Sequence, residues 1–259
     1  MASFYAHYRF GKLLLPELPA DVRQCVQRFR RVYDMGLQGP DIFFYYNPMI
    51  KNAVSQVGYS CHRMSGQPFF THACKAADSE AALVYLYGLL GHYTLDSMVH
   101  PFVYRMVESG QAGHVPLEME FDRYLMEMDG IVNPAAHSMK QLIRLTRGEC
   151  MTVAAFYPPA TGSNVSFAVK SMAFSRGFLA GGNREKREKL LKRIKPSLAE
   201  QFIPTEPVPE YTRMVSELLA RFNRSLRLYP VLLEQLQNHM KKGEALGDEF
   251  APSFNSGRE

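Results

Sequence analysis

The sequence predicts an all-α protein, a single-domain bundle of many helices. Apolar residues recur with the 3.6-residue period of amphipathic helices in most of the long segments. No segment shows the sustained alternation of apolar and polar residues that is typical of a half-buried strand. Hydrophobic residues make up 46% of the 259 residues and charged residues 21%, a composition that indicates a folded globular chain rather than a disordered one.

The expected helices follow one another along the chain. The first spans residues 18–37 and leads into a loop rich in glycine and proline at 36–48. Ser79 is a suitable N-cap for a long helix over 79–100, which Pro101 is expected to bend or end. The next helix is expected from Pro116 to the Asp-Gly pair at 129–130. Further helices are expected at 134–146, 164–177, 183–194, 209–226 and 228–241.

Charge, cysteines and the N-terminus exclude several classes of protein. The net charge is +5, and its densest patch is residues 184–196, with seven basic and two acidic side chains. This patch is either a solvated helix face or a site of attraction to phosphate, in an anionic substrate or at a membrane surface. No apolar run approaches the ~18–20 residues of a membrane span, and the first residues lack the features of a signal peptide. With four cysteines in no paired spacing, the sequence predicts a cytoplasmic protein with free thiols.

Three polar side chains interrupt the long apolar helix at 79–100. His92, Asp96 and His100 are four residues apart, so they stack along one face of that helix. An ionised carboxylate among leucine, valine and phenylalanine needs a partner, and a bound cation would supply one. A carboxylate with two oxygens can also bridge two metal ions. The alternative is a pair of core histidines with satisfied hydrogen bonds and a salt-bridged aspartate.

The rest of the sequence favours the metal site. His114 and Glu118 are again four apart, at the start of the next helix. Nitrogen and oxygen ligands without thiolates suit zinc in a catalytic rather than a structural site. Further candidates lie upstream in the chain: His7, Asp41 and His62.

This ordered set of residues resembles the zinc-dependent phospholipase C family, and it is similar to the related single-strand-specific nucleases. The flanking stretches "HYRFG", "GLQGPDIFFYY" and "GHYTLDSMVHP" add to the resemblance, which covers residues 4–125. It implies an all-α fold that holds two or three zinc ions. Asp41, His62, His92 and Asp96 would hold the first ion, and His100, His114 and Glu118 the second. Asp96 would bridge to a third ion, completed by His7 and, in the secreted enzymes, by the backbone of a processed N-terminal tryptophan, where this chain begins Met-Ala.

Several residues near the candidate ligands in the sequence allow two interpretations. His72 competes with His62 for the first zinc, and the spacing from Asp41 favours His62. Cys61 is expected to pack rather than ligate. Tyr45, Tyr46 and Asn47 are expected either to line the substrate cleft or to pack at the end of a loop. Glu120 and Asp122 are expected either to lie at the surface or to orient an imidazole N–H.

These expectations combine into a function. The protein is expected to be a zinc-dependent phosphodiester hydrolase of phospholipase C type, with Asp41 accepting a proton from the attacking water. Its expected partner is a phospholipid or another phosphodiester, with peripheral membrane contact and no nucleic acid as first choice. One alternative is a phosphodiesterase of nucleotides or nucleic acid, and another is a non-catalytic, zinc-stabilised lipid-binding or scaffold protein. Residues 1–130 are expected to form the metal-binding core, residues 131–243 to add helices packed on it, and residues 244–259 to be a flexible tail.

Overall fold

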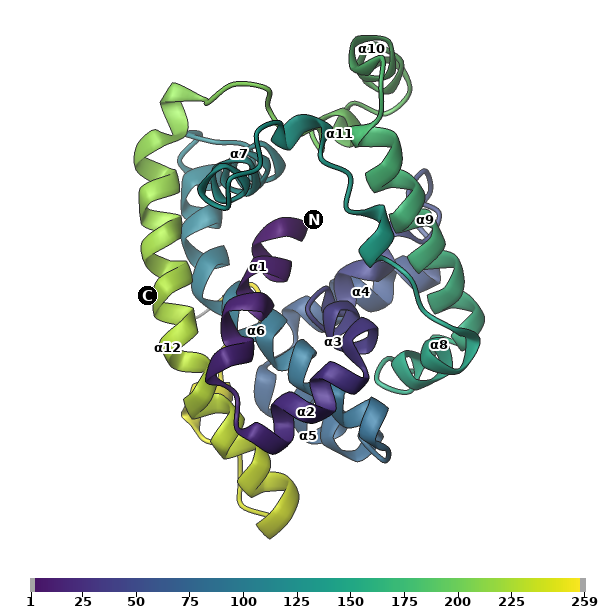
Figure 1. The fold of residues 1–259 in the computed structure, drawn as a ribbon, viewed down its shortest axis with the longest axis vertical. Helices are drawn as coiled ribbons and strands as arrows, with labels where there is room; N and C mark the ends of the chain where they lie inside the picture. The colour runs from purple at the N-terminus through teal and green to yellow at the C-terminus, as the bar shows by residue number, and fades with distance from the viewer. Residues whose placement is uncertain (1–2, 257–259) are drawn as a thin grey trace.

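The long helix α6, Glu80–Glu108, runs through the middle of the molecule and is surrounded by the other helices (Figure 1). The computed structural model describes residues 3–256, and all regular elements in this range are helical, apart from one isolated bridge between Ser65 and Ser253. The all-α prediction is therefore confirmed. None of these helices is both long and apolar enough to cross a lipid bilayer. The other α-helices are α1 (Phe4–Leu14), α2 (Ala20–Arg28), α3 (Arg30–Gly36), α4 (Ala53–Arg63), α5 (Gly66–Ala76), α7 (His114–Met128), α8 (Arg147–Ala154), α9 (Gly162–Ala180), α10 (Arg184–Ile194), α11 (Pro196–Ala199) and α12 (Thr212–Lys242).

Two helices continue through a proline: Pro101, which was expected to bend or end its helix, and Pro230, which lies within the helix expected at 228–241. Ser79 caps α6 as predicted, through its side chain and the backbone N–H of Ala82, but the helix passes Pro101 and ends eight residues after His100. Likewise α12 passes Pro230 and replaces the two helices expected at 209–226 and 228–241. A proline removes one backbone donor, and buried apolar residues on both sides of each proline hold the helix against the core.

Other boundaries also differ from the predictions. The helix expected at 18–37 is divided into α2 and α3 at Phe29, whose backbone is not helical. Residues 134–146 form only two short 3-10 turns instead of a helix, because Met139 and Ile143 are buried in an otherwise irregular connection. Among residues 3–256, five helices, α1, α4, α5, α8 and the short α11, were not expected from the sequence.

Glycines bring α3 and the following loop against α6. A Cβ atom at Gly36 would lie 2.5 Å from the carbonyl oxygen of Tyr85, and one at Gly88 would lie 2.3 Å from that of Tyr33. Gly39 adopts φ +48°, and a Cβ there would lie 2.7 Å from the imidazole of His92. Only glycine permits this approach at these three positions. The glycine-rich loop predicted at 36–48 therefore lies directly beside the polar face of α6, where residues 39–45 form a 3-10 helix.

The C-terminal segment is packed rather than free. A flexible tail was expected at 244–259, yet Leu246, Phe250 and Phe254 are buried. The ring of Phe254 contacts the rings of Phe69 and Tyr93, and Tyr93 donates a hydrogen bond to the carbonyl of Pro252. The expectation is therefore wrong for residues 244–256, because these aromatic side chains fill the space beside α5 and α6. Residues 257–259 lie outside the described part of the chain.

Candidate metal centre

Five elements bring the predicted ligands to one buried place. The 3-10 helix Gly39–Tyr45 contributes one residue, α1 and α4 contribute one each, α7 contributes two, and α6 contributes three. Seven of the eight side chains are buried, and His114 is the most exposed, with 22% of its side chain accessible. The structure thus brings together all eight predicted residues: His7, Asp41, His62, His92, Asp96, His100, His114 and Glu118.

Asp96 lies at the centre of the cluster. Its Oδ1 is 3.0 Å from Nε2 of His7, and its Oδ2 is 3.1 Å from Nε2 of His92. The same Oδ2 lies 3.7 Å from Nε2 of His62 and 3.8 Å from Nδ1 of His100. The two oxygens therefore face different imidazoles, as a bridging carboxylate requires.

The eight residues fall into three groups, two of which share His92. His7, His92 and Asp96 form one, Asp41, His62 and His92 form the second, and His100, His114 and Glu118 form the third. Within each group the possible ligand atoms lie within 4.8 Å of one another, a spacing that one ion can span.

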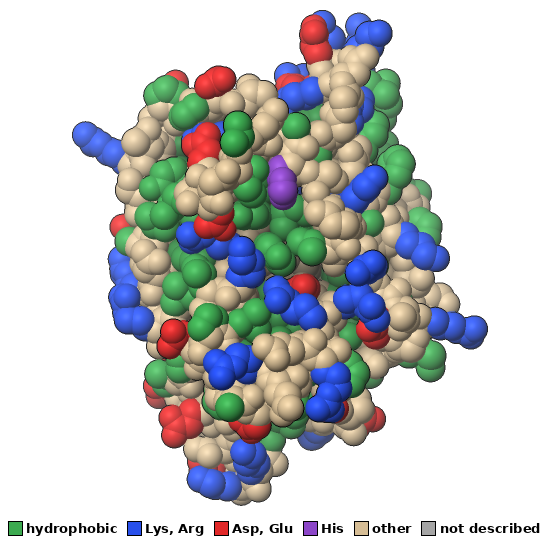
Figure 2. Space-filling view, viewed as in Figure 1, with side chains coloured by type: hydrophobic (Ala, Val, Ile, Leu, Met, Phe, Trp, Pro, Cys, Tyr) green, Lys and Arg blue, Asp and Glu red, His purple; other side chains and the backbone are tan. Residues whose placement is uncertain are grey.

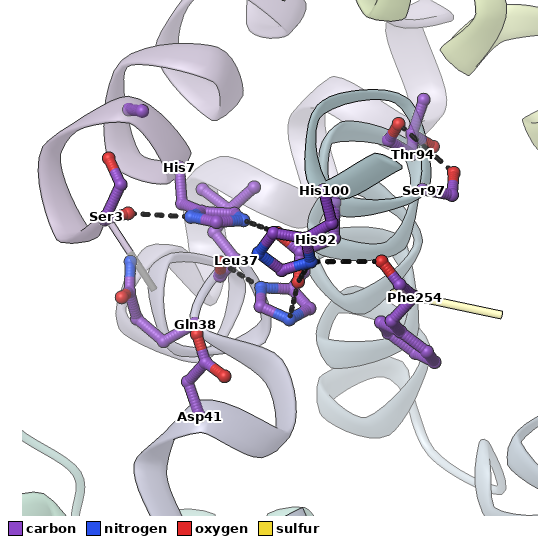
Figure 3. Close-up of polar contacts among 12 residues, drawn as sticks. Ser3, His7, Leu37, Gln38, Asp41, His92, Thr94, Ser97, His100 and Phe254 are labelled. Carbon is purple, nitrogen blue, oxygen red and sulfur yellow. Dashed lines mark hydrogen bonds and ion pairs between the residues drawn. The ribbon is translucent and has the colours of Figure 1, made fainter. Parts of the chain in front are cut away.

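Backbone carbonyls fix the orientation of four imidazoles. The Nδ1–H of His7 donates to the carbonyl of Ser3 at 2.7 Å, and that of His62 donates to the carbonyl of Gly58 at 2.7 Å. The carbonyl of Leu37 accepts from Nδ1 of His92 at 3.1 Å, and that of Phe254 accepts from Nδ1 of His100 at 3.1 Å (Figure 3). With Nδ1–H donated outward, the lone pair of each Nε2 points into the cluster, which is the arrangement of metal-binding histidines.

Buried polar atoms without partners also indicate a cation. Among the described residues, five atoms of the cluster have no assigned hydrogen bond: both Oδ atoms of Asp41, Nε2 of His92, Oδ2 of Asp96 and Oε2 of Glu118. Oδ1 of Asp41 lies 2.9 Å from Nε2 of His62, and Oδ2 of Asp96 lies 3.1 Å from Nε2 of His92, but these contacts are ion pairs only where the imidazole carries a second proton. Leaving such atoms unsatisfied in the interior is costly, and a coordinated ion would satisfy them. The residues present therefore fit a metal ion of the kind that imidazole and carboxylate bind.

The protonation of the metal-free cluster follows from its charges. Burial alone would lower the pKa of His7 and His62, but Asp96 raises the pKa of His7 to about 9 and Asp41 raises that of His62 to about 10. Burial alone would raise the pKa of Asp41, Asp96 and Glu118, but the facing imidazoles hold all three below their ordinary values. The carboxylates are thus ionised, and without metal the positive charge opposite them is carried by protons.

The neighbouring candidates are placed as follows. His72 is exposed on α5 and outside the cluster, as the preference for His62 anticipated. Burial raises the pKa of the Cys61 thiol to about 12, so this residue packs as a neutral thiol. The hydroxyls of Tyr45 and Tyr46 accept hydrogen bonds from Arg176 and Asn164, which ties the end of the 3-10 helix to α9.

Two acidic residues are not where the sequence analysis placed them. Glu120 is buried in an ion pair with Arg123, 2.7 Å between Oε1 and Nη2. Asp122 is fully buried and accepts hydrogen bonds from the hydroxyl of Ser3 and from the backbone N–H groups of Tyr5 and Ala6. It therefore binds the N-terminus of α1, the helix that carries His7.

Some functional groups had no signal in the sequence. The carbonyls of Leu37 and Phe254 and the carboxylate of Asp122 act through contacts between distant parts of the chain, so no local spacing reveals them. The carbonyls of Ser3 and Gly58 lie only four residues before the histidines that they orient. The backbone of the first residue, which completes a third zinc site in the secreted enzymes, lies outside the described residues.

Comparison with known proteins agrees with the geometry. A family model described as zinc dependent phospholipase C matches residues 6–161, more than half of the chain. This match extends beyond the resemblance noted at residues 4–125 and includes all eight clustered residues. No curated protein and no solved structure matches the chain significantly. By its family match, and consistently with its helical fold and its histidine and carboxylate cluster, the chain belongs to the zinc-dependent phospholipase C family.

Proposed function

We propose that the protein hydrolyses phosphodiesters with two or three zinc ions held by the eight clustered residues, and that its substrate is a phospholipid. The observation that carries this proposal is the set of unsatisfied, buried ligand atoms arranged around Asp96. Membership of the family supports phosphodiesterase chemistry in general.

The geometry favours a particular division of the ligands. His92 belongs to two of the groups, but its single free Nε2 can bind one ion only. Since Oδ2 of Asp96 faces His62 and His92 and Oδ1 faces His7, we assign Asp41, His62, His92 and Asp96 to one ion. His100, His114 and Glu118 would hold a second, and His7 with Oδ1 of Asp96 would hold a third.

The chemistry then depends on a few side chains. Bound zinc stabilises the charge that develops on phosphate oxygens and makes hydroxide available near neutral pH. Burial would raise the pKa of Asp41, but the imidazole of His62 holds it below its ordinary value, so the carboxylate is ionised. One of its oxygens could then bind zinc while the other accepts the proton of the attacking water. The exposed edge of His114 marks the side from which a phosphodiester reaches the cluster, next to the ring of Tyr104, 5.2 Å from the ring of His114.

The test is hydrolysis by zinc-loaded protein of nitrophenyl phosphocholine and of phosphatidylcholine in mixed micelles. We expect nitrophenol from the first and diacylglycerol from the second, with both activities lost after chelation and restored by zinc. Cleavage of single-stranded DNA with no release of diacylglycerol would indicate the nucleic-acid phosphodiesterase instead. Tightly bound zinc without turnover of any of these substrates would contradict the proposed function.

A further inference from the structure

An apolar groove lies between α9, α10 and α11, outside the metal centre. Its volume is about 530 Å³, within the range of ligand-binding pockets. The walls are chiefly apolar side chains, among them Met49, Phe174, Phe178, Leu191 and Leu198. The helices that form it begin at Gly162, after the end of the family match at residue 161, so the catalytic proposal does not account for this groove.

Large apolar side chains are exposed around the groove. Phe174 is 73% exposed, Phe167 is 51% exposed, and Ile50, beside Met49, is 64% exposed. Hydrophobic side chains gather along the right-hand edge of the molecule, over α9 (Figures 1 and 2). A contiguous exposed apolar surface of this kind is typical of an interaction site rather than of an ordinary protein surface.

Helix α10 adds positive charge to the same surface. It has no buried residue and packs mainly on α9 and α11. Three of the basic residues at 184–195 hold the helix in place by donating to backbone carbonyls: Arg184 to Ile203, Arg187 to Phe178 and Gly181, and Lys195 to Pro48.

The remaining basic residues of α10 are exposed. Lys189 and Lys192 pair with glutamates on their own helix, while Lys186 and Arg193 make no ion pair within residues 3–256. Lys186, Leu190 and Ile194 follow one another at four-residue steps, so exposed apolar and basic side chains share one face. Lys and Arg side chains cover the helix where it projects from the molecule (Figure 2).

We propose that this surface, formed by α9, α10 and the loop at Met49 and Ile50, docks on an anionic phospholipid membrane, with the groove receiving an acyl chain. Exposed aromatic and aliphatic residues next to Lys and Arg are the composition that binds at a membrane interface. A second copy of this chain fits less well, because it is itself positively charged, with a net charge of +5. The docking goes beyond the proposed hydrolysis and does not require it.

The experiment measures sedimentation of the full-length, zinc-loaded protein with vesicles. One set contains phosphatidylcholine alone, and the other contains about one third phosphatidylglycerol. We expect stronger binding to the second set, weakened by salt. Since each basic residue near an anionic surface contributes about fivefold to binding, the double variant Lys186→Glu, Arg193→Glu should bind at least about twenty-five-fold more weakly. Phe174→Ser with Ile194→Ser should remove the binding that persists at high salt.

The controls separate docking from catalysis and from net charge. Arg213→Glu with Arg227→Glu makes the same charge change at exposed positions of α12, at the opposite side of the molecule from α9 (Figure 1), and should bind nearly as the parent does. Asp96→Asn should keep vesicle binding whatever its activity, so a failure of the proposed hydrolysis leaves docking measurable. Equal binding to both vesicle sets, equal loss in the α12 control, or dimerisation through α10 in place of vesicle binding would overturn the proposal. Dichroism establishes that each variant is folded.

Discussion

Replacing Asp96 by asparagine is the most informative single change in the cluster. The substitution keeps the size of the side chain but removes its charge and converts one oxygen into an NH₂ group. That oxygen faces either His7, at 3.0 Å from Oδ1, or His92, at 3.1 Å from Oδ2. Both imidazoles lose their anionic partner, and whichever way the amide turns, one of them faces an NH₂ group instead of an oxygen. A carboxylate bridge between two ions can no longer form.

The size of the effect in the metal-free protein follows from the charges on the imidazoles. Asp96 is the largest cause that raises the pKa of His7, from 6.5 to about 9. Since a tenfold change in an equilibrium corresponds to about 1.4 kcal/mol, this interaction stabilises the metal-free fold by about 3 kcal/mol at pH 6. Asp96→Asn should lower the free energy of unfolding by about that amount, measured by urea denaturation in the presence of a chelator.

The zinc-loaded protein gives the sharper test. Asp96→Asn should lose at least one zinc ion per chain and at least about a hundredfold of its rate on nitrophenyl phosphocholine, since even groups that only orient a metal ligand are worth 10–100-fold. Asp34→Asn is a control: Asp34 is partly buried and paired, 2.7 Å from Nε of Arg30, but lies outside the cluster. It should lose stability without losing zinc. If Asp96→Asn folds, keeps all of its zinc and retains turnover, the cluster is not built around this residue.

Three further predictions concern the surroundings of the cluster. Asp122→Asn should destabilise the protein by about 1.5–3 kcal/mol, the contribution of a hydrogen bond to a charged group. It should lower zinc content by no more than one ion, because Asp122 positions only α1 and His7. Loss of all zinc, measured by plasma emission, would contradict this. The metal-free protein should be most stable near pH 6 and should lose stability as the pH rises toward 9 and 10. The reason is that folding raises the pKa values of His7 and His62 to about 9 and about 10. Urea midpoints that stay constant between pH 6 and pH 10 would refute this prediction. Phe254→Ala should cost about 3–5 kcal/mol of stability but keep the backbone carbonyl that orients His100, so zinc should still bind at saturating concentration, as equilibrium dialysis would show.

The part of the site that depends on local geometry could be predicted from the sequence. Four-residue spacing on a helix places His92, Asp96 and His100 on one face whatever the rest of the fold does, and the same holds for His114 and Glu118. The approach of the upstream residues was implied only by the resemblance to the family. It depends on the glycines that let the loop at 36–48 lie against α6.

The parts that depend on tertiary packing were missed. A helical pattern was read at 134–146, where buried Met139 and Ile143 lie in an irregular connection. Pro101 was expected to bend or end a helix that packing on both sides maintains. The C-terminal segment was expected to be flexible because it is a chain terminus, yet Phe254 contacts the rings of His62 and His92, more than 150 residues away in the sequence. Contacts at such separation leave no periodic pattern in the sequence.

Zinc content tests the central claim most directly. The protein should be purified without chelator, supplemented with zinc, freed of excess by gel filtration and analysed by plasma emission spectroscopy against its measured concentration. The eight clustered ligands predict two or three zinc ions per chain, reduced by at least one in Asp96→Asn. Less than one bound zinc per folded chain would contradict the assignment of the cluster as a metal centre.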